Sequence, residues 1–381
     1  MGYRGGKLDS EIIEKIGVPS VLRDLRIPGT PEYYGGRNAG SHPPDGFVET
    51  GGFWVPDELV RHQEQVTYGQ RQHPRGIGYH FGAVTRMRMV AQEHPEWAAT
   101  SWTALGIWGV EYFVDDADTC VLSNGRASLA KSATAVTRHR NQSVHAATVV
   151  FTPDPYCREL MTVPPVMAFA MALRSLSAGQ HRWNVPQGTG LSDEDLRAVQ
   201  LIDAVSTTFG VDPQRWPDAC HYLLSTRRLR RLVALCDQGA ESPTETVMRL
   251  MAAQIQPGMV SQLVVLADGT VADPVHTKGA LPGRIRNGQG RSRQGRVANG
   301  TAGRIVARLD LGHPELKLAL QYDGAGHMTA DRRDRDSKIN AELANLGWHV
   351  VRITYGHLRD PNLFETTVRD AVSYCRRRMT R

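Results

Sequence analysis

The chain has 381 residues, of which 22% are charged, and carries a formal net charge of +6. This length predicts two or three domains with enough chain for a packed core. The five cysteines are scattered without a CxxC pair or a nearby histidine, which argues against structural zinc and against a disulfide framework and predicts reduced, mostly buried thiols. No apolar run approaches the ~18 residues of a membrane span, and the N-terminal segment MGYRGGKLDSEIIEKIG lacks the apolar core of a signal peptide. We therefore expect a cytoplasmic protein without a membrane partner.

Residues 1–50 are rich in glycine and proline, which predicts an extended arm with one short helix over Ser10–Ile16, capped by Ser10. In residues 51–125, helical spacing recurs over Phe81–Ala91 and over Trp102–Trp108, and His94-Pro95 breaks the pattern between them. Short helices before a strand-like segment are compatible with a winged-helix module, whose recognition helix would enter a DNA major groove. A helical packing domain without DNA contact is the alternative.

Residues 126–240 form an α+β middle segment. We expect a strand over Ala146–Phe151, a buried helix over Met161–Leu176 and a helix that starts after Ser192. A further helix over about Ser225–Cys236 carries four arginines on more than one face, so they cannot all be buried. They form either a solvated face or a phosphate-contacting surface that includes Arg227, Arg228 and Arg231.

Residues 241–256 predict a helix with Ser242 as N-cap and Pro243 at its first position, and Glu245 at the third position completes a capping box. After a strand over Val260–Leu266 comes a stretch at about 268–303 that is rich in glycine and arginine. No acid interrupts its second half, so we interpret it as a flexible basic insertion that tracks a phosphate backbone, with a solubilising loop as the alternative. Its candidate contact residues are Arg284, Arg286, Arg291, Arg293 and Arg296.

Apolar residues over Ile305–Asp310 and Lys317–Asp323 predict two strands, joined by a turn at His313-Pro314-Glu315. Gln321 and Asp323 are two residues apart, so their side chains leave the same face of the strand. Asp310 ends the neighbouring strand, where a partner for that face would lie. Carboxylates from adjacent strands are the minimum that holds a divalent metal ion.

These segments resemble a known family. Glu241-Ser-Pro-Thr-Glu245, Leu309-Asp310-Leu311, Gln321-Tyr-Asp-Gly-x-x-His327 and Leu346-Gly-Trp-His-Val-Val-Arg352 are similar to the domain related to very-short-patch-repair endonucleases, within the PD-(D/E)xK group. The resemblance covers residues 241–376 and implies that residues 241–381 form an α/β domain with a mixed central sheet flanked by helices, as in restriction endonucleases. Upstream, the segment from Ser101 to Gly109 resembles a signature of AbiEi-type antitoxins, in a mainly α N-terminal region.

By this resemblance, Mg²⁺ (or Mn²⁺) is held by Asp310, Asp323 and Glu245, and the ion would lower the barrier to phosphodiester hydrolysis. His327 is the leading proton donor or water-orienting group, and Lys338 on the following helix is a second candidate. The family usually has glutamate where this chain has Gln321, an amide that ligates without charge.

The sequence therefore predicts a metal-dependent DNA endonuclease. The alternative is a catalytically weak or inactive DNA-binding regulator of antitoxin type, built on a nuclease fold and favoured by Gln321. RNA is a third candidate partner, since the arginine- and glycine-rich stretch also suits RNA.

Overall fold

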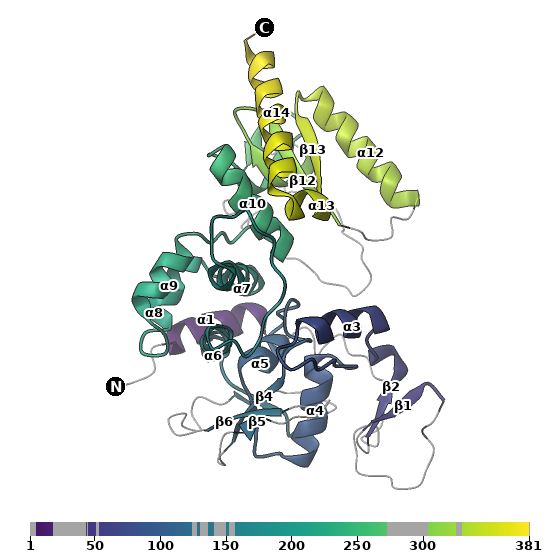
Figure 1. Ribbon diagram of the computed structural model, residues 1–381, viewed down its shortest axis with the longest axis vertical. Helices are drawn as coiled ribbons and strands as arrows, with labels where there is room; N and C mark the ends of the chain where they lie inside the picture. The colour runs from purple at the N-terminus through teal and green to yellow at the C-terminus, as the bar shows by residue number, and fades with distance from the viewer. Residues whose placement is uncertain are drawn as a thin grey trace. The chain divides into compact units, whose positions relative to one another are not determined.

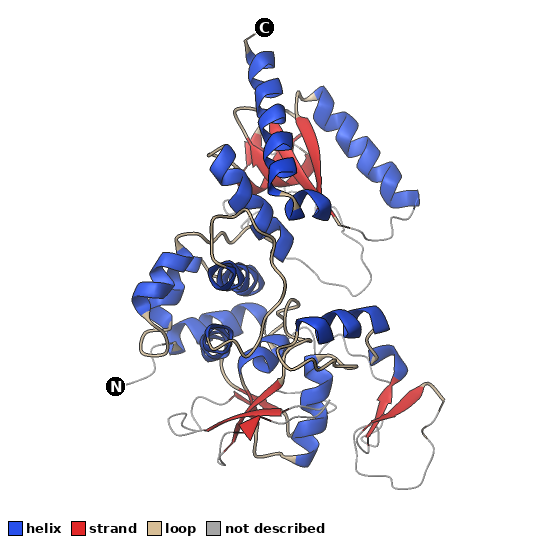
Figure 2. Cartoon of the chain, viewed as in Figure 1, coloured by secondary structure: helices blue, strands red, loops and turns tan. Residues whose placement is uncertain are grey.

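The computed structural model describes residues 5–17, 43, 45–50, 53–123, 128–129, 136–140, 150–151, 157–272, 304–324 and 330–380, with the backbone alone for 128–129, 136–140, 150–151 and 330–335. The fold is mixed α/β, with three sheets among the described residues (Figure 2). The chain divides into two compact units. The first comprises residues 1–184 and 208–234, and the second comprises residues 185–207 and 235–381.

The first unit contains helices around a mixed sheet (Figure 1). Its elements are α1 (Gly6–Ile16), β1 (Phe47–Thr50), β2 (Phe53–Pro56), the 3₁₀ turn η2 (Asp57–Leu59), α3 (Gln63–Gln72), α4 (Ala83–Glu93), β3 (Ala98–Ala99), α5 (Ser101–Ile107), β4 (Thr119–Ser123), β5 (Ser128–Leu129), β6 (Val136–Arg140), β7 (Val150–Phe151), β8 (Met161–Thr162), α6 (Pro165–Ser177), η4 (Pro213–Arg215), α8 (Trp216–Ala219) and α9 (Thr226–Val233).

The large sheet of this unit has the strand order β5-β6-β4-β3-β8-β7, and β1 and β2 form a separate antiparallel hairpin. β4 pairs in parallel with β6, and β3 pairs in parallel with β8, while the other pairs in this sheet are antiparallel. The core is built on α5 and α6, where Trp102, Leu105 and Phe169 are buried. Because α5 is buried all round, its seven residues are held by packing rather than by helix propensity.

A side chain from α1 caps another helix of the first unit. The N-cap Pro164 of α6 provides no side-chain acceptor, and the backbone N–H of Val166 instead donates to the Asp9 carboxylate at 2.8 Å. Asp9 is buried at this contact. A carboxylate at a helix N-terminus is stabilised by the helix dipole and satisfies an otherwise orphaned donor, so Asp9 fastens α1 to α6.

The second unit is a sheet with helices on both faces. Its elements are α7 (Asp193–Phe209, whose last two residues are assigned to the first unit), α10 (Pro243–Ile255), β9 (Val260–Leu266), β10 (Val271–Ala272), β11 (Ile305–His313), β12 (Leu318–Asp323), α12 (Ala330–Asn345), β13 (His349–Thr354), α13 (Tyr355–Arg359) and α14 (Pro361–Met379).

The sheet of the second unit has the order β10-β9-β11-β12-β13. Its first four strands pair antiparallel, and β13 joins β12 in parallel after the crossover through α12. One face packs on α12, with Leu309, Leu343 and Trp348 in a common cluster. The helices α10, α13 and α14 contact each other and cover the other face, so β12 and β13 lie between α14 and α12 (Figure 1).

Several helix boundaries follow from local capping chemistry, two of them at the predicted caps Ser192 and Ser242. Ser242 is the N-cap of α10, with Pro243 at its first position, and the Ser192 hydroxyl accepts from the N–H of Asp195 at the start of α7. Asp360 caps α14 by accepting from the N–H groups of Asn362 and Leu363. Gly347, with φ of 86°, ends α12 in a left-handed conformation that a glycine adopts at no steric cost.

Three boundaries predicted from sequence are wrong. The expected helix over Met161–Leu176 starts only at Pro165, because Met161 and Thr162 form β8 at the sheet. Helix α1 begins at Gly6, so Ser10 lies inside it and donates to the carbonyl of Gly6 instead of capping the helix. β11 continues to His313, which leaves Pro314 to Lys317 as the turn.

Two other expectations concern cysteines and membrane spans. None of the five cysteines forms a disulfide, and four of them are buried, as predicted, while Cys236 is half-buried. In the described portion of the chain, no helix combines the length and the apolar character needed to cross a bilayer.

Candidate functional site

Glu245, in the first turn of α10, is held by three hydrogen-bond donors. Its Oε2 accepts from the backbone N–H of Glu241 at 3.0 Å and from the side-chain amide of Gln262 at 2.8 Å. Its Oε1 accepts from the Ser242 hydroxyl at 2.9 Å, while the Ser242 Oγ accepts from the N–H of Glu245 at 3.2 Å. The capping box is therefore shifted by one residue, since the glutamate accepts from the residue before the N-cap.

Asp310 lies in β11, at the point where its ladder with β12 ends. The last pair of that ladder is Leu311 with Leu320, whereas on its other side β11 pairs Leu309 with Leu263 and Leu311 with Ser261, so Asp310 lies level with Gln262 of β9. Instead of continuing the ladder, Asp310 Oδ2 accepts from the backbone N–H of Tyr322 at 2.7 Å. This bond fixes the carboxylate at the point where the two strands part.

The carboxylates of Glu245 and Asp310 are electrostatically coupled. Burial first, and then the charges of Asp310 and Glu241, raise the pKa of Glu245 to about 7, against the lowering effect of its hydrogen bonds. Burial also raises the pKa of Asp310; Glu241 adds to the rise, whereas the Tyr322 N–H, Arg352 and Arg308 oppose it. Both acids thus lie in partly buried surroundings where their ionised forms are disfavoured, and the charge of one acts on the other.

Gln262 is a contact that sequence reasoning missed. It lies in the middle of β9, is buried, and has a φ of 54°, although the β9–β11 ladder continues on both sides of it. The left-handed region is strained for a residue other than glycine, and such residues cluster at functional sites. A polar residue inside the apolar run Val-Ser-Gln-Leu-Val-Val was the available sequence signal.

Glu241 and Arg308 border this pair. Their side chains form an ion pair at 3.1 Å, with Arg308 on β11 and Glu241 just before α10. Arg352 on β13 pairs in register with Gln321, and its charge also lowers the pKa of Asp310. A third carboxylate and two guanidinium groups therefore act on the two acids, and none of the three was predicted from the sequence to belong to the site.

Gln321 and Asp323 lie on the opposite face of β12 from Tyr322. The Tyr322 hydroxyl hydrogen-bonds with Thr244 on α10, and successive side chains of a strand point to opposite faces. The β12–β13 register is regular from Leu318 to Asp323, so this alternation is unbroken. The structure therefore brings Asp310 and Glu245 together and directs Asp323 away from α10.

The remaining predicted site residues are spread more widely. Lys338 is exposed on α12, and His327 lies outside the described residues, as do Arg284, Arg286, Arg291, Arg293 and Arg296. The first residues of the proposed insertion at about 268–303 form a turn and β10, which pairs with β9; residues 273–303 lie outside the described residues. In the first unit, Arg227 and Arg231 are exposed on α9, and Arg228 donates to the Ser177 hydroxyl at 2.9 Å.

The carboxylates at this site fit a cation that takes few oxygen ligands from the protein, rather than a cation enclosed by protein ligands. Among the residues described, no group of three or more His, Cys, Asp or Glu side chains is arranged to hold a metal ion. Mg²⁺, however, is commonly bound by one or two carboxylates together with waters and phosphate oxygens. Glu245 and Asp310 supply that number of carboxylates, and a dication between them would relieve the repulsion that raises the pKa of Glu245.

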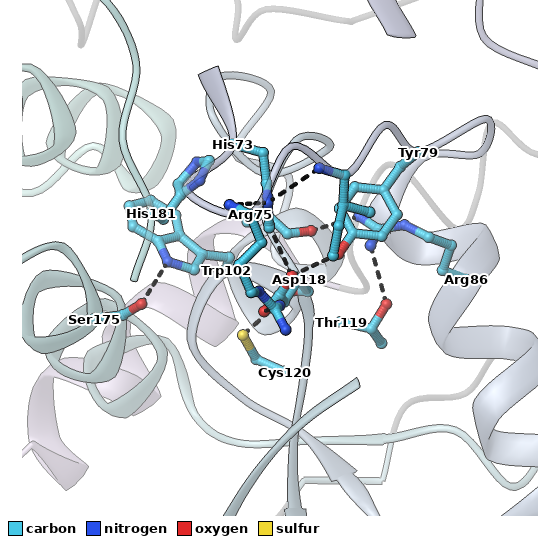
Figure 3. A network of polar contacts seen from close by, with 12 residues as sticks. His73, Arg75, Tyr79, Arg86, Trp102, Asp118, Thr119, Cys120, Ser175 and His181 are labelled. Carbon is cyan, nitrogen blue, oxygen red and sulfur yellow. Dashed lines mark hydrogen bonds and ion pairs between the residues drawn. The ribbon is translucent and has the colours of Figure 1, made fainter. Parts of the chain in front are cut away.

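The first unit contains a separate buried polar network around Asp118 (Figure 3). The Asp118 carboxylate accepts from His73 Nε2 at 2.9 Å, from the Tyr79 hydroxyl at 2.5 Å and from the Arg75 guanidinium. Nearby, the buried Arg86 donates to the carbonyls of Phe81, Asp115 and Ala117 and to the Thr119 hydroxyl. The donors and acceptors of this network are hydrogen-bonded to one another, and the bonds hold the segment before β4 in place. We therefore assign the network a structural role.

Comparison with known proteins adds no relative. No protein-family model, no curated protein and no solved structure matches the chain.

Proposed function

We propose that this chain is a metal-dependent DNA endonuclease whose phosphodiester-hydrolysing centre is built on Asp310 and Glu245. The observation that carries the proposal is the coupling of these two carboxylates, since burial and mutual repulsion hold the pKa of Glu245 at about 7. Perturbed titratable groups of this kind are concentrated at functional sites. A bound Mg²⁺ or Mn²⁺ would supply positive charge for the phosphodiester transition state.

The topology of the second unit supports this assignment. The order α10, β9, β11, β12, α12, β13 gives a mixed central sheet flanked by helices, which is what a restriction-endonuclease-like domain requires. Asp310 is on a central strand and Glu245 on the helix that precedes the sheet, as the resemblance to very-short-patch-repair endonucleases implies. The winged-helix and AbiEi-like identity of the first unit, and DNA contact by its exposed α9 arginines, belong to the same proposal.

The test is cleavage of supercoiled plasmid in the presence of Mg²⁺ or Mn²⁺. We expect nicking by the wild-type protein, suppressed by a chelator and reduced at least about 100-fold by Asp310→Asn, because one ionised ligand is lost. Glu365→Gln is the matched control, since Glu365 is an exposed acid on α14 paired with Arg369. Nicking that survives Asp310→Asn would show that the activity comes from elsewhere.

A second function is favoured by specific contacts. Gln321 stands where the family that the chain resembles has a charged glutamate, and both oxygens of Glu245 already accept hydrogen bonds from protein donors. These features suit a nuclease fold that serves as a DNA-binding regulator without catalysis. Plasmid binding that is strong, steeply salt-dependent and free of nicking would support this function. Competition among duplex DNA, single-stranded DNA and structured RNA at one fixed salt concentration identifies the nucleic acid that is bound.

A further inference from the structure

The first unit contains a cavity that is unrelated to the carboxylate site. It has a volume of about 480 Å³ and lies between the C-terminal end of α6 and the segment from Tyr222 through α9. Its floor includes Leu173, Leu224, Leu229 and Leu232. This volume is in the range of pockets that hold small organic ligands, which are lined mainly by apolar side chains with a few placed polar groups.

Two arginines are the charged residues in the lining of this cavity. Arg174, exposed on the last turns of α6, and Arg228, in the first turn of α9, both line it. Arg228 is oriented by its bond to the Ser177 hydroxyl at 2.9 Å. An arginine guanidinium carries several N–H donors in one fixed plane. The bond to Ser177 uses one of these donors and sets the orientation of the plane.

The local electrostatics of α9 favour an anion at the same place. The first turn of α9 has no acidic residue but carries Arg227 and Arg228, and its N-cap Ser225 makes no side-chain capping bond. Positive side chains at a helix N-terminus oppose the helix dipole, whereas an anion there is stabilised. Ser225 and Arg228 both line the cavity, so an anionic group inside it would offset this unfavourable arrangement.

Tyr222 adds an aromatic edge to the cavity. Its φ is 72° and the residue is 53% exposed, in the turn between Cys220 and α9. A left-handed conformation is strained for a residue other than glycine, and this exposed tyrosine lines the cavity. An exposed aromatic ring beside an apolar floor is suited to cover an apolar ligand.

We propose that this cavity binds a small amphipathic anion, with its apolar body on the leucine floor and its carboxylate or phosphate between Arg174 and Arg228. The site does not depend on the endonuclease proposal. The site also distinguishes Arg228 from Arg227. Arg227 is exposed and suited to contact nucleic acid, whereas Arg228 is half-buried and lines the cavity.

Isothermal titration calorimetry with defined probes tests the proposal on the full chain. The probes are decanoate and decyl phosphate below their micelle concentrations, with decan-1-ol and decyltrimethylammonium as uncharged and cationic chains of the same length and inorganic phosphate as the headgroup alone. We expect saturable one-to-one binding of at least one of the two anionic chains and markedly weaker binding of the other three probes. Arg228→Gln should weaken the binding about 10- to 100-fold, as expected for loss of a charged hydrogen-bond donor.

Two further variants complete the design. Arg227→Gln removes the same charge from the same helix outside the cavity and should leave the affinity within about twofold. Ala178→Trp, at an exposed position lining the cavity, should abolish binding by filling it while the melting temperature is maintained. The proposal is overturned if neither anionic chain binds saturably, if decan-1-ol or inorganic phosphate binds equally well, or if Arg227→Gln weakens binding as much as Arg228→Gln.

Discussion

Glu245 on α10 and Asp310 on β11 come from segments separated by a long stretch of sequence, yet the charge of Asp310 adds to the effect of burial in raising the pKa of Glu245. Each carboxylate is also fixed by backbone donors, Glu245 by the N–H of Glu241 and Asp310 by the N–H of Tyr322. The fold therefore maintains two repelling acids in place. Such an arrangement costs stability at neutral pH unless a cation or a proton is present.

The first prediction concerns pH and stability. The folded protein holds the Glu245 proton up to about pH 7, whereas the unfolded chain releases it near pH 4.5. Unfolding between these pH values releases a proton, so stability falls as the pH rises from 4.5 to 7, by roughly 3 kcal/mol in total. In Glu245→Gln this part of the pH dependence should be absent, which makes the variant more stable than wild type at pH 8 but not at pH 4.5. Scanning calorimetry of both proteins across this range checks the prediction, and parallel curves would contradict it.

The second prediction separates Asp310 from Asp323. Because Asp323 lies on the opposite face of β12 from Tyr322 and α10, we expect Asp323→Asn to keep most of the stabilisation that Mg²⁺ gives the wild-type protein. Asp310→Asn should lose it. The Mg²⁺-induced rise in melting temperature should also grow from pH 6 to pH 8, since Glu245 must lose its proton before it can bind a cation. Equal losses in both variants would mean that Asp323 reaches the cation.

The third prediction concerns the backbone of Gln262. Gln262→Gly and Gln262→Ala both remove the amide that donates to Glu245, so they differ chiefly in how well they tolerate a φ of 54°. The alanine variant should be less stable than the glycine variant by about 1 kcal/mol, which reverses the usual preference for alanine over glycine inside a strand. Hydrogen exchange of the β9 amides measures the difference, and a more stable alanine variant would show that the strand relaxes.

The fourth prediction concerns the network around Asp118. Asp118→Ala leaves His73, Tyr79 and Arg75 without their shared acceptor in a buried place, so we expect a loss of about 3–5 kcal/mol. Asp218→Ala is the control, because that side chain is 87% exposed and its ion pair with Arg230 spans 3.7 Å; it should cost less than about 0.5 kcal/mol. Denaturation followed by tryptophan fluorescence reports on the first unit, which contains Asp118, since six of the seven tryptophans lie there. A loss below 1 kcal/mol for Asp118→Ala would contradict the structural role.

The sequence predicted the elements whose ends are set by local chemistry. The caps at Ser192 and Ser242 are the clearest cases, because a side chain decides each boundary within a few residues. The predicted strand over Val260–Leu266 also coincides with β9, since its apolar run is bounded by turn residues.

The features that were predicted wrongly, or not predicted at all, depend on tertiary contacts. The cap that α6 receives comes from Asp9, far away in sequence, and Met161 forms a strand only because β3 and β7 pair with its segment. At the candidate site, period-two alternation placed Gln321 and Asp323 together but could not tell which face of the sheet Glu245 approaches. The contribution of Gln262 was invisible for the same reason, since a left-handed residue inside a strand contradicts local preference and is maintained by its neighbours.

The position of a bound divalent ion tests the central claim most directly. Crystals soaked in Mn²⁺ and measured for anomalous scattering should show a peak within bonding distance of carboxylate oxygens from both Asp310 and Glu245, and the peak should vanish in Asp310→Asn. A Mn²⁺ peak that contacts neither side chain, or a soaked crystal with no peak near them, would contradict the account.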